Sequence, residues 1–335
     1  MPRRIGVVGF RGYSGAEIVA LLKRHPGVET VLLEHRHDAD HRVEPVGVWQ
    51  PKRAAATPEA AAAEAIELVF LATPPEVSME LTPGFLNRGI RVVDLSGAFR
   101  LRTVENYRRW YKEDHTAPEL LSTAVYGLPE FCRSRIPLAA LISNPGCYPT
   151  AANLAIRPLV EAQVVDRRAG IVCDAKSGVS GAGRKPSLKT SFCEAAENLS
   201  AYSILDHRHV PEVLLTSGLE EAEFSFTAQL IPIDRGILET IYLRVNNAVT
   251  ADKILEVYRE RYKNDTFIRL YKPGHVPDLR AVQRTNFCDI GFKYDAATGR
   301  LVVVSAIDNL VKGAAGQAIQ NMNLVLGFAE TEALL

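Results

Sequence analysis

Residues 141–157 read LISNPGCYPTAANLAIR and join a predicted strand to a predicted helix. The apolar run at 138–142 ends in the turn-forming residues 143–146, and Cys147 follows directly. Pro149 suits the first position of a helix, because the N–H group that proline lacks would have no partner there. Cys147 should therefore lie beside the open N–H groups of a helix start, which lower a thiol's pKa and favour the reactive thiolate. The alternative is a buried cysteine that simply follows a strand.

The composition of the 335-residue chain limits its class. Its 39 basic and 39 acidic residues give zero net charge, so no nucleic-acid partner is predicted. No apolar stretch approaches the roughly 20 residues that span a membrane, and the N-terminus enters an apolar run without room for a signal peptide. The five cysteines are an odd number without CxxC spacing, which is typical of a reducing compartment and not of a disulfide framework or a zinc site. We expect a cytoplasmic, two-domain protein without a bound metal.

Alternating strand and helix patterns over about the first 145 residues predict a doubly wound parallel sheet of Rossmann type. Strands are expected at 5–10, 29–33, 68–72 and 90–95, and helices at 16–24, 54–65 and 77–86. Ligands of such sheets bind beyond the carboxyl ends of the strands. The sequence predicts a binding site at this edge, where four features fall: 9–15, 73–75, 94–100 and Cys147.

The first of these turns carries glycines at Gly9, Gly12 and Gly15 between a strand and a helix. In this position a dinucleotide's pyrophosphate rests on the helix N-terminus, although the GxxGxxG spacing differs from GxGxxG and a plain turn is the alternative. At the end of the next strand, Glu34 would bind a ribose 2′-hydroxyl and Arg36 would favour a 2′-phosphate, so the spacing leaves NAD and NADP open. The nearby histidines are expected in a solvated loop, without a metal: His35, His37 and His41.

From about residue 160 the pattern changes to that of a mixed or antiparallel sheet. Strands are expected at 170–174, 224–232, 238–245, 287–292 and 300–306, and helices at 251–262 and 314–328, of which the last returns to the first domain. The second domain is therefore predicted to be α+β, and the predicted domains are 1–146 with 311–335, and 147–310.

Two segments of the second domain carry candidate functional residues. The stretch 175–185, AKSGVSGAGRK, has glycines, serines and cations that predict a flexible loop able to approach an anion, with a surface linker as the alternative. Further on, His207 and His209 are spaced i, i+2. On an extended segment they would point to opposite faces, which argues against one shared metal.

Motifs along nearly the whole chain resemble those of the N-acetyl-γ-glutamyl-phosphate reductase family, in the aspartate-semialdehyde-dehydrogenase-like superfamily. They are GFRGYSGAE (9–17), DLSGAFRL (94–101), YGLPE (126–130), SNPGCYPT (143–150), DAKSGVSGAGRK (174–185), HRHVPE (207–212) and DNLVKGAAGQAIQNMN (308–323). The resemblance implies an NADP-binding Rossmann-type domain and a second, catalytic domain. An exposed sheet in this second domain would suit assembly as a homodimer or homotetramer. It also implies an NADPH-dependent reductive dephosphorylation of a small-molecule acyl phosphate, N-acetyl-γ-glutamyl phosphate, to its semialdehyde in arginine biosynthesis.

By match to these motifs, the thiolate of Cys147 would attack the acyl phosphate, expel phosphate and form a thioester. The nicotinamide would then give a hydride to the thioester, and His209 would move the protons near neutral pH. The resemblance assigns substrate binding to Asn144, Tyr202, His207, Arg208 and Arg100. It assigns cofactor binding, with a preference for NADP, to Gly9, Gly12, Tyr13, Ser14, Gly15, Arg36, Ser96, Ser177, Gly178 and Asn309.

Three positions depart from the family's pattern. Residues 74–76 read PPE in place of a PHG-type turn, Gln229 stands where a histidine is common, and Arg284 stands where a glycine is expected. A relative that reduces a carrier-bound aminoadipate phosphate in lysine synthesis shares the motifs, so that substrate is the alternative. In other classes, Cys147 would suit a nucleotide-binding redox sensor, and with His209 a cysteine hydrolase, for which the glycine-rich turn would have no purpose.

Overall fold

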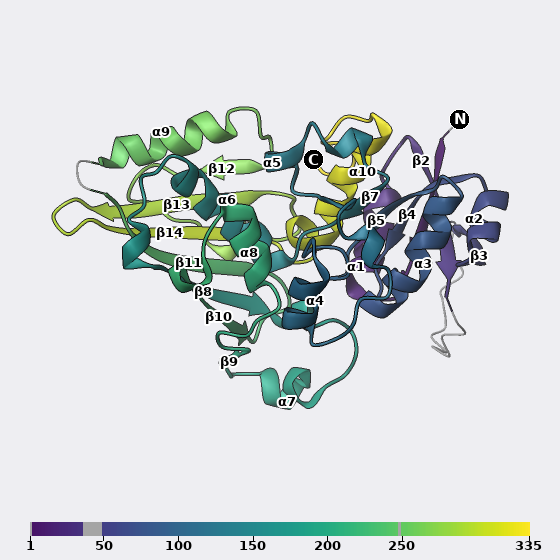
Figure 1. The fold of residues 1–335 in the computed structure, drawn as a ribbon, viewed down its shortest axis with the longest axis horizontal. Coiled ribbons are helices and arrows are strands. Elements are labelled where there is room, and N and C mark those ends of the chain that lie inside the picture. Colours follow the sequence, from purple (N-terminus) through teal and green to yellow (C-terminus); the bar gives the residue numbers. More distant parts are fainter. Residues whose placement is uncertain (1, 36–48, 247–248) are drawn as a thin grey trace. The chain divides into compact units, whose positions relative to one another are not determined.

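The computed structural model of the chain describes residues 2–35, 49–246 and 249–335 and is drawn in Figure 1. The chain divides into two compact units. Unit 1 comprises Met1–Tyr107, Glu113–Asn144 and Ala318–Leu335, and unit 2 comprises Arg108–Lys112 and Pro145–Gln317. The functional domains expected from the sequence, with boundaries after residues 146 and 310, stay a prediction.

Unit 1 is built on a parallel sheet whose described strands follow the order β3-β2-β1-β4-β5-β7-β6. Every described pair in this sheet is parallel. Consecutive residues of β1, β2 and β4 are buried, so both faces of the sheet are covered. The order runs outward from β1 in both directions, which confirms the doubly wound sheet. The strands are β1 (Arg3–Val8), β2 (Val28–Glu34), β3 (Lys52–Ala55), β4 (Ile66–Leu71), β5 (Arg91–Asp94), β6 (Val125–Tyr126) and β7 (Leu141–Ser143).

The helices that lie wholly or mostly in unit 1 are α1 (Tyr13–Leu22), α2 (Pro58–Ala63), α3 (Pro75–Asn87), α5 (Pro129–Cys132) and α10 (Gly316–Leu326), and α4 (Val104–Tyr111) is divided equally between the two units. The surface helix expected at 54–65 is partly wrong. Residues 52–55 instead form β3, because they pair with β2 at the edge of the sheet. The helix starts only at Pro58, where the hydroxyl of Thr57 accepts the N–H of Ala60 at 3.2 Å and caps it.

Unit 2 is built on a mixed sheet with the described order β12-β13-β14-β11-β8-β10-β9. The β8–β10 and β12–β13 pairs are parallel and the others are antiparallel, as expected for an α+β domain. The strands are β8 (Ile171–Gly178), β9 (Ser200–Tyr202), β10 (Phe224–Ile231), β11 (Ile237–Arg244), β12 (Ile268–Leu270), β13 (Cys288–Asp295) and β14 (Arg300–Ile307). The helices are α6 (Cys147–Glu161), α7 (Phe192–Ala195), α8 (Val210–Ser217) and α9 (Ala251–Tyr262).

Helix α6 is the element around which unit 2 packs. It lies on β11, β13 and β14 and contacts α8 and α9 (Figure 1). From α9, the hydroxyls of Tyr258 and Tyr262 donate to the carbonyls of Ala155 at 2.6 Å and Leu154 at 2.5 Å. Because the helix is buried along most of its length and bonded to its neighbour, its first residue, Cys147, has a fixed position.

Two further expectations for unit 2 need correction. The helix expected to start at Pro149 starts at Cys147, and Pro149 is its third residue, where a missing N–H still costs no hydrogen bond. The stretch 175–185 is not a loop throughout, because β8 continues to Gly178. Its residues pair with β10 on one side and β11 on the other, and this tertiary pairing outweighs the loop-like composition.

Short 3₁₀ segments lie at Pro118–Leu120, Ile136–Leu138, Arg167–Ala169, Val179–Ala182, Leu188–Thr190, Glu221–Glu223 and Leu279–Ala281, and a π-helical turn spans Val311–Ala315. Arg284, where the family pattern has glycine, adopts a φ of 60°. This is the left-handed region that favours glycine, and the N–H of Arg284 donates to Asp308 at 2.7 Å there. None of the described helices has the length and apolar character needed to span a membrane.

Candidate active site

Cys147 is the first residue of α6 and is half-buried at the wall of a cavity of about 380 Å³. Two glycines make room around it. A Cβ on Gly146 would lie 2.7 Å from Nε2 of His209, and a Cβ on Gly313 would lie 2.8 Å from the Cβ of Cys147. The imidazole of His209 therefore covers the residue before the cysteine, and it lines the same cavity.

Glu212 links the histidine to the turn that carries the cysteine. Its carboxylate is fully buried at the start of α8, and one oxygen accepts the N–H of Gly146 at 2.9 Å. The other oxygen lies 4.0 Å from Nε2 of His209. The carboxylate thus contacts both the turn before Cys147 and the imidazole of His209. Glu212 lies within the HRHVPE motif without a predicted role, and its position three residues after His209 is the signal in the sequence that points to it.

His207 and His209 do not point to opposite faces, contrary to the expectation for an extended segment. They lie in a turn, where the N–H of His209 donates to Nδ1 of His207 at 3.1 Å and the ring centroids are 4.8 Å apart. Burial, and secondarily the charge of Arg208, lowers the pKa of His207 to about 4. His207 is therefore neutral at pH 7 with its proton on Nε2, since Nδ1 accepts a hydrogen bond.

Two tyrosines complete the aromatic wall beside the histidines. The hydroxyls of Tyr148 and Tyr202 are 3.2 Å apart, and Tyr148 donates to the carbonyl of Gln229 at 3.4 Å, so Tyr202 is the donor between them. Burial raises the pKa of both phenols, which keeps them protonated. The side chain of Gln229, where the family pattern has a histidine, donates to Asp174 at 2.5 Å.

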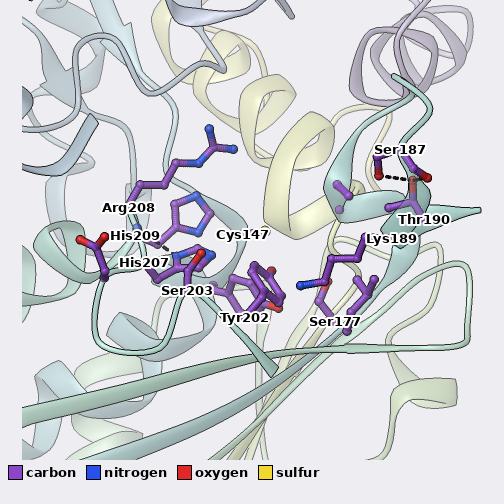
Figure 2. A pocket seen from close by; sticks show the side chains of 15 residues that line it. Cys147, Ser177, Ser187, Lys189, Thr190, Tyr202, Ser203, His207, Arg208 and His209 are labelled. Atoms are coloured by element: carbon purple, nitrogen blue, oxygen red, sulfur yellow. Dashed lines mark hydrogen bonds between the residues drawn. The ribbon is translucent and has the colours of Figure 1, made fainter. Parts of the chain in front are cut away.

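Figure 2 shows the cavity with His207, Arg208 and His209 on one side and Ser177 and Lys189 on the other, with Tyr202 between them. The structure thus brings together the predicted residues Cys147, His209, His207, Arg208, Tyr202 and Ser177 at one cavity. All of them belong to unit 2. A half-buried thiol at a helix start, a histidine with a buried carboxylate and a cationic side chain can carry out acyl transfer through a covalent intermediate.

The remaining residues predicted for the cofactor in unit 2 have structural bonds. Asn309 accepts the N–H of Gly236 at 2.7 Å and donates to Ser180 at 3.0 Å, and Ser177 donates to the carbonyl of Gly178 at 3.0 Å. A Cβ on Gly178 would lie 2.5 Å from the carbonyl oxygen of Asp234, so the glycine permits a close backbone contact. Their roles toward a cofactor stay predictions.

The glycine-rich turn of unit 1 has the tight geometry that a dinucleotide site needs. Gly9 has a φ of 77°, and a Cβ there would lie 2.2 Å from the carbonyl oxygen of Ala72. A Cβ on Gly15 would lie 2.2 Å from the carbonyl oxygen of Gly9. The N-cap of α1 is Gly12, which offers no side-chain cap, so the N–H groups of the first turn are open to an anion. Tyr13 is exposed and Ser14 half-buried at this helix start.

A buried polar network lies at the carboxyl ends of β5 and β7. Ser96 donates to Asp94 at 2.7 Å, and burial raises the pKa of that carboxyl. Arg100 is itself buried, and its guanidinium donates to the carbonyls of Asn144 at 2.8 Å and Leu95 at 2.7 Å. Ser96, Arg100 and Asn144 thus stabilise this edge of the sheet, and their contacts with ligands stay predictions.

The end of β2 carries a charged cluster. Oε1 of Glu34 lies 3.3 Å from Arg11 and 3.0 Å from Arg53, and both guanidiniums lie over the ring of Phe10, at 4.7 and 5.7 Å from its centroid. Arg36, His37 and His41 lie outside the described residues. His35 lies 3.8 Å from Glu80. Within the described ranges no group of three or more histidine, cysteine or acidic side chains is placed to hold a metal ion.

Two family models match the chain. Residues 4–139 match the semialdehyde dehydrogenase NAD binding domain, and residues 147–309 match the semialdehyde dehydrogenase dimerisation domain. Among solved structures, aspartate semialdehyde dehydrogenase II from Vibrio cholerae has a TM-score of 0.72 at 16% identity, over 98% of this chain and 99% of that chain. The NADP complex of the Candida albicans enzyme has a TM-score of 0.71 at 17% identity, over 97% and 99%. The fold is that of the semialdehyde dehydrogenases.

Curated relatives narrow the class. N-acetyl-γ-glutamyl-phosphate reductase of Symbiobacterium thermophilum is 45% identical over 350 residues, with 100% of this chain and 98% of the relative covered. The enzyme of the same name from Geobacillus sp. is 43% identical, with 99% and 98% covered. The chain belongs to the N-acetyl-γ-glutamyl-phosphate reductase family, which confirms the resemblance drawn from its motifs.

Proposed function

We propose that this chain catalyses the NADPH-dependent reduction of N-acetyl-γ-glutamyl phosphate to N-acetylglutamate 5-semialdehyde and phosphate, in arginine biosynthesis. The observation that carries the proposal is the meeting of Cys147, His209 and Glu212 at the N-terminus of α6, in a chain whose relatives bear the name of this reductase. A carrier-bound aminoadipate phosphate is the alternative substrate that the experiment below separates.

The first half-reaction uses groups of unit 2. The Cys147 thiolate attacks the acyl carbon, the bond from that carbon to the phosphate oxygen breaks, and phosphate leaves with the bonding electrons. A thioester on Cys147 results. The first turn of α6 stabilises the thiolate, because Cys147 lies at the positive end of the helix dipole. Arg208 at the cavity wall supplies a positive charge for the phosphate.

The second half-reaction returns the thiol. A bound nicotinamide supplies the hydride that converts the thioester into a hemithioacetal. His209 donates a proton to the developing alkoxide and removes it again when the carbon–sulfur bond breaks, which releases the aldehyde. His207 is the poorer proton carrier near neutral pH, because its pKa is lowered to about 4. It acts instead as a neutral Nε2–H donor to the substrate.

The residues of unit 1 fit a dinucleotide. The backbones of Gly9 and Gly15 lie so close together that neither position has room for a side chain. The start of α1, which has no side-chain cap, suits a pyrophosphate. For the choice of NADP we infer that Arg11 and Arg53 bind the 2′-phosphate. Both guanidiniums lie beside Glu34 at the end of β2, where the ribose of a dinucleotide binds in this type of fold.

Assembly and location are proposed from the domain match and from the cysteines. The match to a dimerisation domain over residues 147–309 supports a homodimer or homotetramer. All five cysteines are free, which supports a reducing compartment such as the cytoplasm.

The test is a spectrophotometric assay in the reverse direction, with N-acetylglutamate 5-semialdehyde, phosphate and NADP. We expect phosphate-dependent NADPH formation that exceeds the rates with NAD and with N-acetylaminoadipate semialdehyde. Cys147→Ser should abolish it, because an alcohol is a far weaker nucleophile near neutral pH. Cys193→Ser, at an exposed cysteine, is the matched control and should keep full activity. Preference for the aminoadipate substrate, or activity in the Cys147→Ser variant, would contradict the proposal.

A further inference from the structure

The 3₁₀ turn at Leu188–Thr190 contributes a wall of the Cys147 cavity that the reaction above does not use. Lys189 and Thr190 of this turn line the cavity. The ammonium nitrogen of Lys189 lies 4.4 Å from the ring centroid of Tyr202. This cation–π contact holds the end of a long, flexible side chain at the cavity. Figure 2 shows Lys189 and Arg208 on opposite sides, with Tyr202 between them.

Neither cation is neutralised by a carboxylate in the described part of the chain. The acidic residue at the cavity wall, Asp206, lies 3.7 Å from the ammonium of Lys112, an exposed pair. Lys189 and Arg208 are themselves exposed to the cavity. Two cations that face one cavity from different sides favour a ligand with two separate negative charges.

We propose that Lys189 binds the α-carboxylate of the substrate and gives the site its preference for a free carboxylate at that end. The inference rests on the proposed function, from which it takes the substrate. N-acetyl-γ-glutamyl phosphate carries its phosphate on C5 and its carboxylate on C1, at opposite ends of a four-bond carbon chain. Each end of the substrate then contacts one of the two cations, Lys189 or Arg208.

The arrangement of the cavity decides which cation meets which end. The phosphate leaves from the carbon that Cys147 attacks, so it belongs beside His209 and its neighbour Arg208. The hydroxyl of Tyr202 faces that of Tyr148, the residue next to Cys147. Lys189 lies over the face of the Tyr202 ring, away from the Arg208 side of the cavity (Figure 2). The distal carboxylate is the anion that remains for Lys189.

The experiment compares the wild-type enzyme with the Lys189→Met variant on two substrates in the reverse assay. Lys189→Met removes the charge at nearly constant length. The substrates are N-acetylglutamate 5-semialdehyde and its α-carboxamide, which lacks the negative charge. We expect Lys189→Met to lower kcat/KM for the acid by about 10- to 100-fold, mainly through KM, as is typical for the loss of a charge-assisted hydrogen bond. The kcat/KM for the amide should change less than about twofold, since the amide offers no charge for Lys189 to bind.

Two further variants keep the result interpretable. Lys272→Met changes an exposed lysine of unit 2 that does not line the cavity, and it should leave kcat/KM for both substrates unchanged. Lys189→Arg should restore most of the preference for the acid. If Lys189→Met lowers kcat/KM equally for acid and amide, or for neither, the inference is wrong while the reductase assignment stands. Failure of the wild-type enzyme to turn over the acid would overturn the proposed function, and this inference with it.

Discussion

Oε1 of Glu212 lies 4.0 Å from Nε2 of His209, and the other oxygen of the same buried carboxylate accepts the N–H of Gly146. A single side chain thus sets the distance between the imidazole and the turn that ends in Cys147. Glu212 thus connects the start of α8 with the start of α6, and these two helix starts are more than 60 residues apart in the chain. This connection makes Glu212 a positioning residue for the two groups to which the proposed function assigns the chemistry.

Glu212→Gln should lower kcat/KM by about 10- to 100-fold, because a neutral amide interacts less strongly than a carboxylate with the N–H of Gly146 and with the imidazole of His209. The decrease should appear in kcat more than in KM, since the carboxylate acts on the catalytic groups and not on the substrate. Steady-state kinetics check this. Glu221→Gln, at an exposed residue of unit 2 that pairs with Arg109, is the matched control and should be silent. Equal effects of the two substitutions would argue against a positioning role.

Gly146→Ala should reduce activity strongly while the fold persists. The added Cβ would lie 2.7 Å from Nε2 of His209, so the imidazole must move away from the Cys147 turn. The expected result is a loss of at least about 10-fold in kcat with little change in thermal unfolding. Calorimetry beside the kinetic assay measures both. Full activity of the Gly146→Ala variant would show that catalysis does not require the His209 imidazole at its position beside Gly146.

His207 gives unit 2 a predictable pH dependence. Its pKa is lowered to about 4 in the folded chain, against about 6.5 when unfolded, so the unfolded chain binds the proton more tightly. Stability from this group is therefore present above about pH 6.5 and is lost as the pH falls toward 4. Between pH 7 and pH 5 the loss is about 2 kcal/mol.

Urea unfolding at these two pH values measures the loss. His207→Gln should remove most of this pH dependence, whereas His275→Gln, at an exposed histidine, should preserve it. An unchanged pH dependence in His207→Gln would show that the imidazole is not held neutral.

The cofactor preference should depend on the cluster around Glu34. Arg53→Ala should raise KM for NADP several-fold and leave KM for NAD nearly unchanged, because only NADP carries the 2′-phosphate. Glu34→Gln should shift the preference further toward NADP by removing a negative charge beside that group. The ratio of kcat/KM for the two cofactors is the measurement. Parallel changes for NADP and NAD would place the 2′-phosphate elsewhere.

The local elements of the fold were predictable where short-range signals are strong. The strand, glycine turn and helix around Gly9 follow from residues next to one another, and so does a helix start near Cys147. The flexible loop expected at 175–185 is wrong for residues 175–178, because the pairing of β8 with β10 and β11 outweighs the glycine and serine content. Similarly, the edge strand β3 exists through its pairing with β2.

The sequence motifs pointed to Cys147 and His209, whose reactive roles stay predictions, and not to the residues that support them. Cys147 and His209 stood out through their motifs, whereas Glu212 and Lys189 act through contacts that form only in the folded chain. The expectation for His207 and His209 failed because it assumed an extended backbone. A turn closed by the bond from the N–H of His209 to His207 puts both rings at one cavity.

The most direct test of the account is the identity of the covalent intermediate. The enzyme is mixed with N-acetylglutamate 5-semialdehyde and NADP in the absence of phosphate, then quenched in acid for mass spectrometry. Without phosphate the thioester has no acceptor besides water, so we predict a burst of one NADPH for each subunit and an N-acetylglutamyl adduct on Cys147. An active enzyme that shows neither the burst nor an adduct, or an adduct on another residue, would contradict the account.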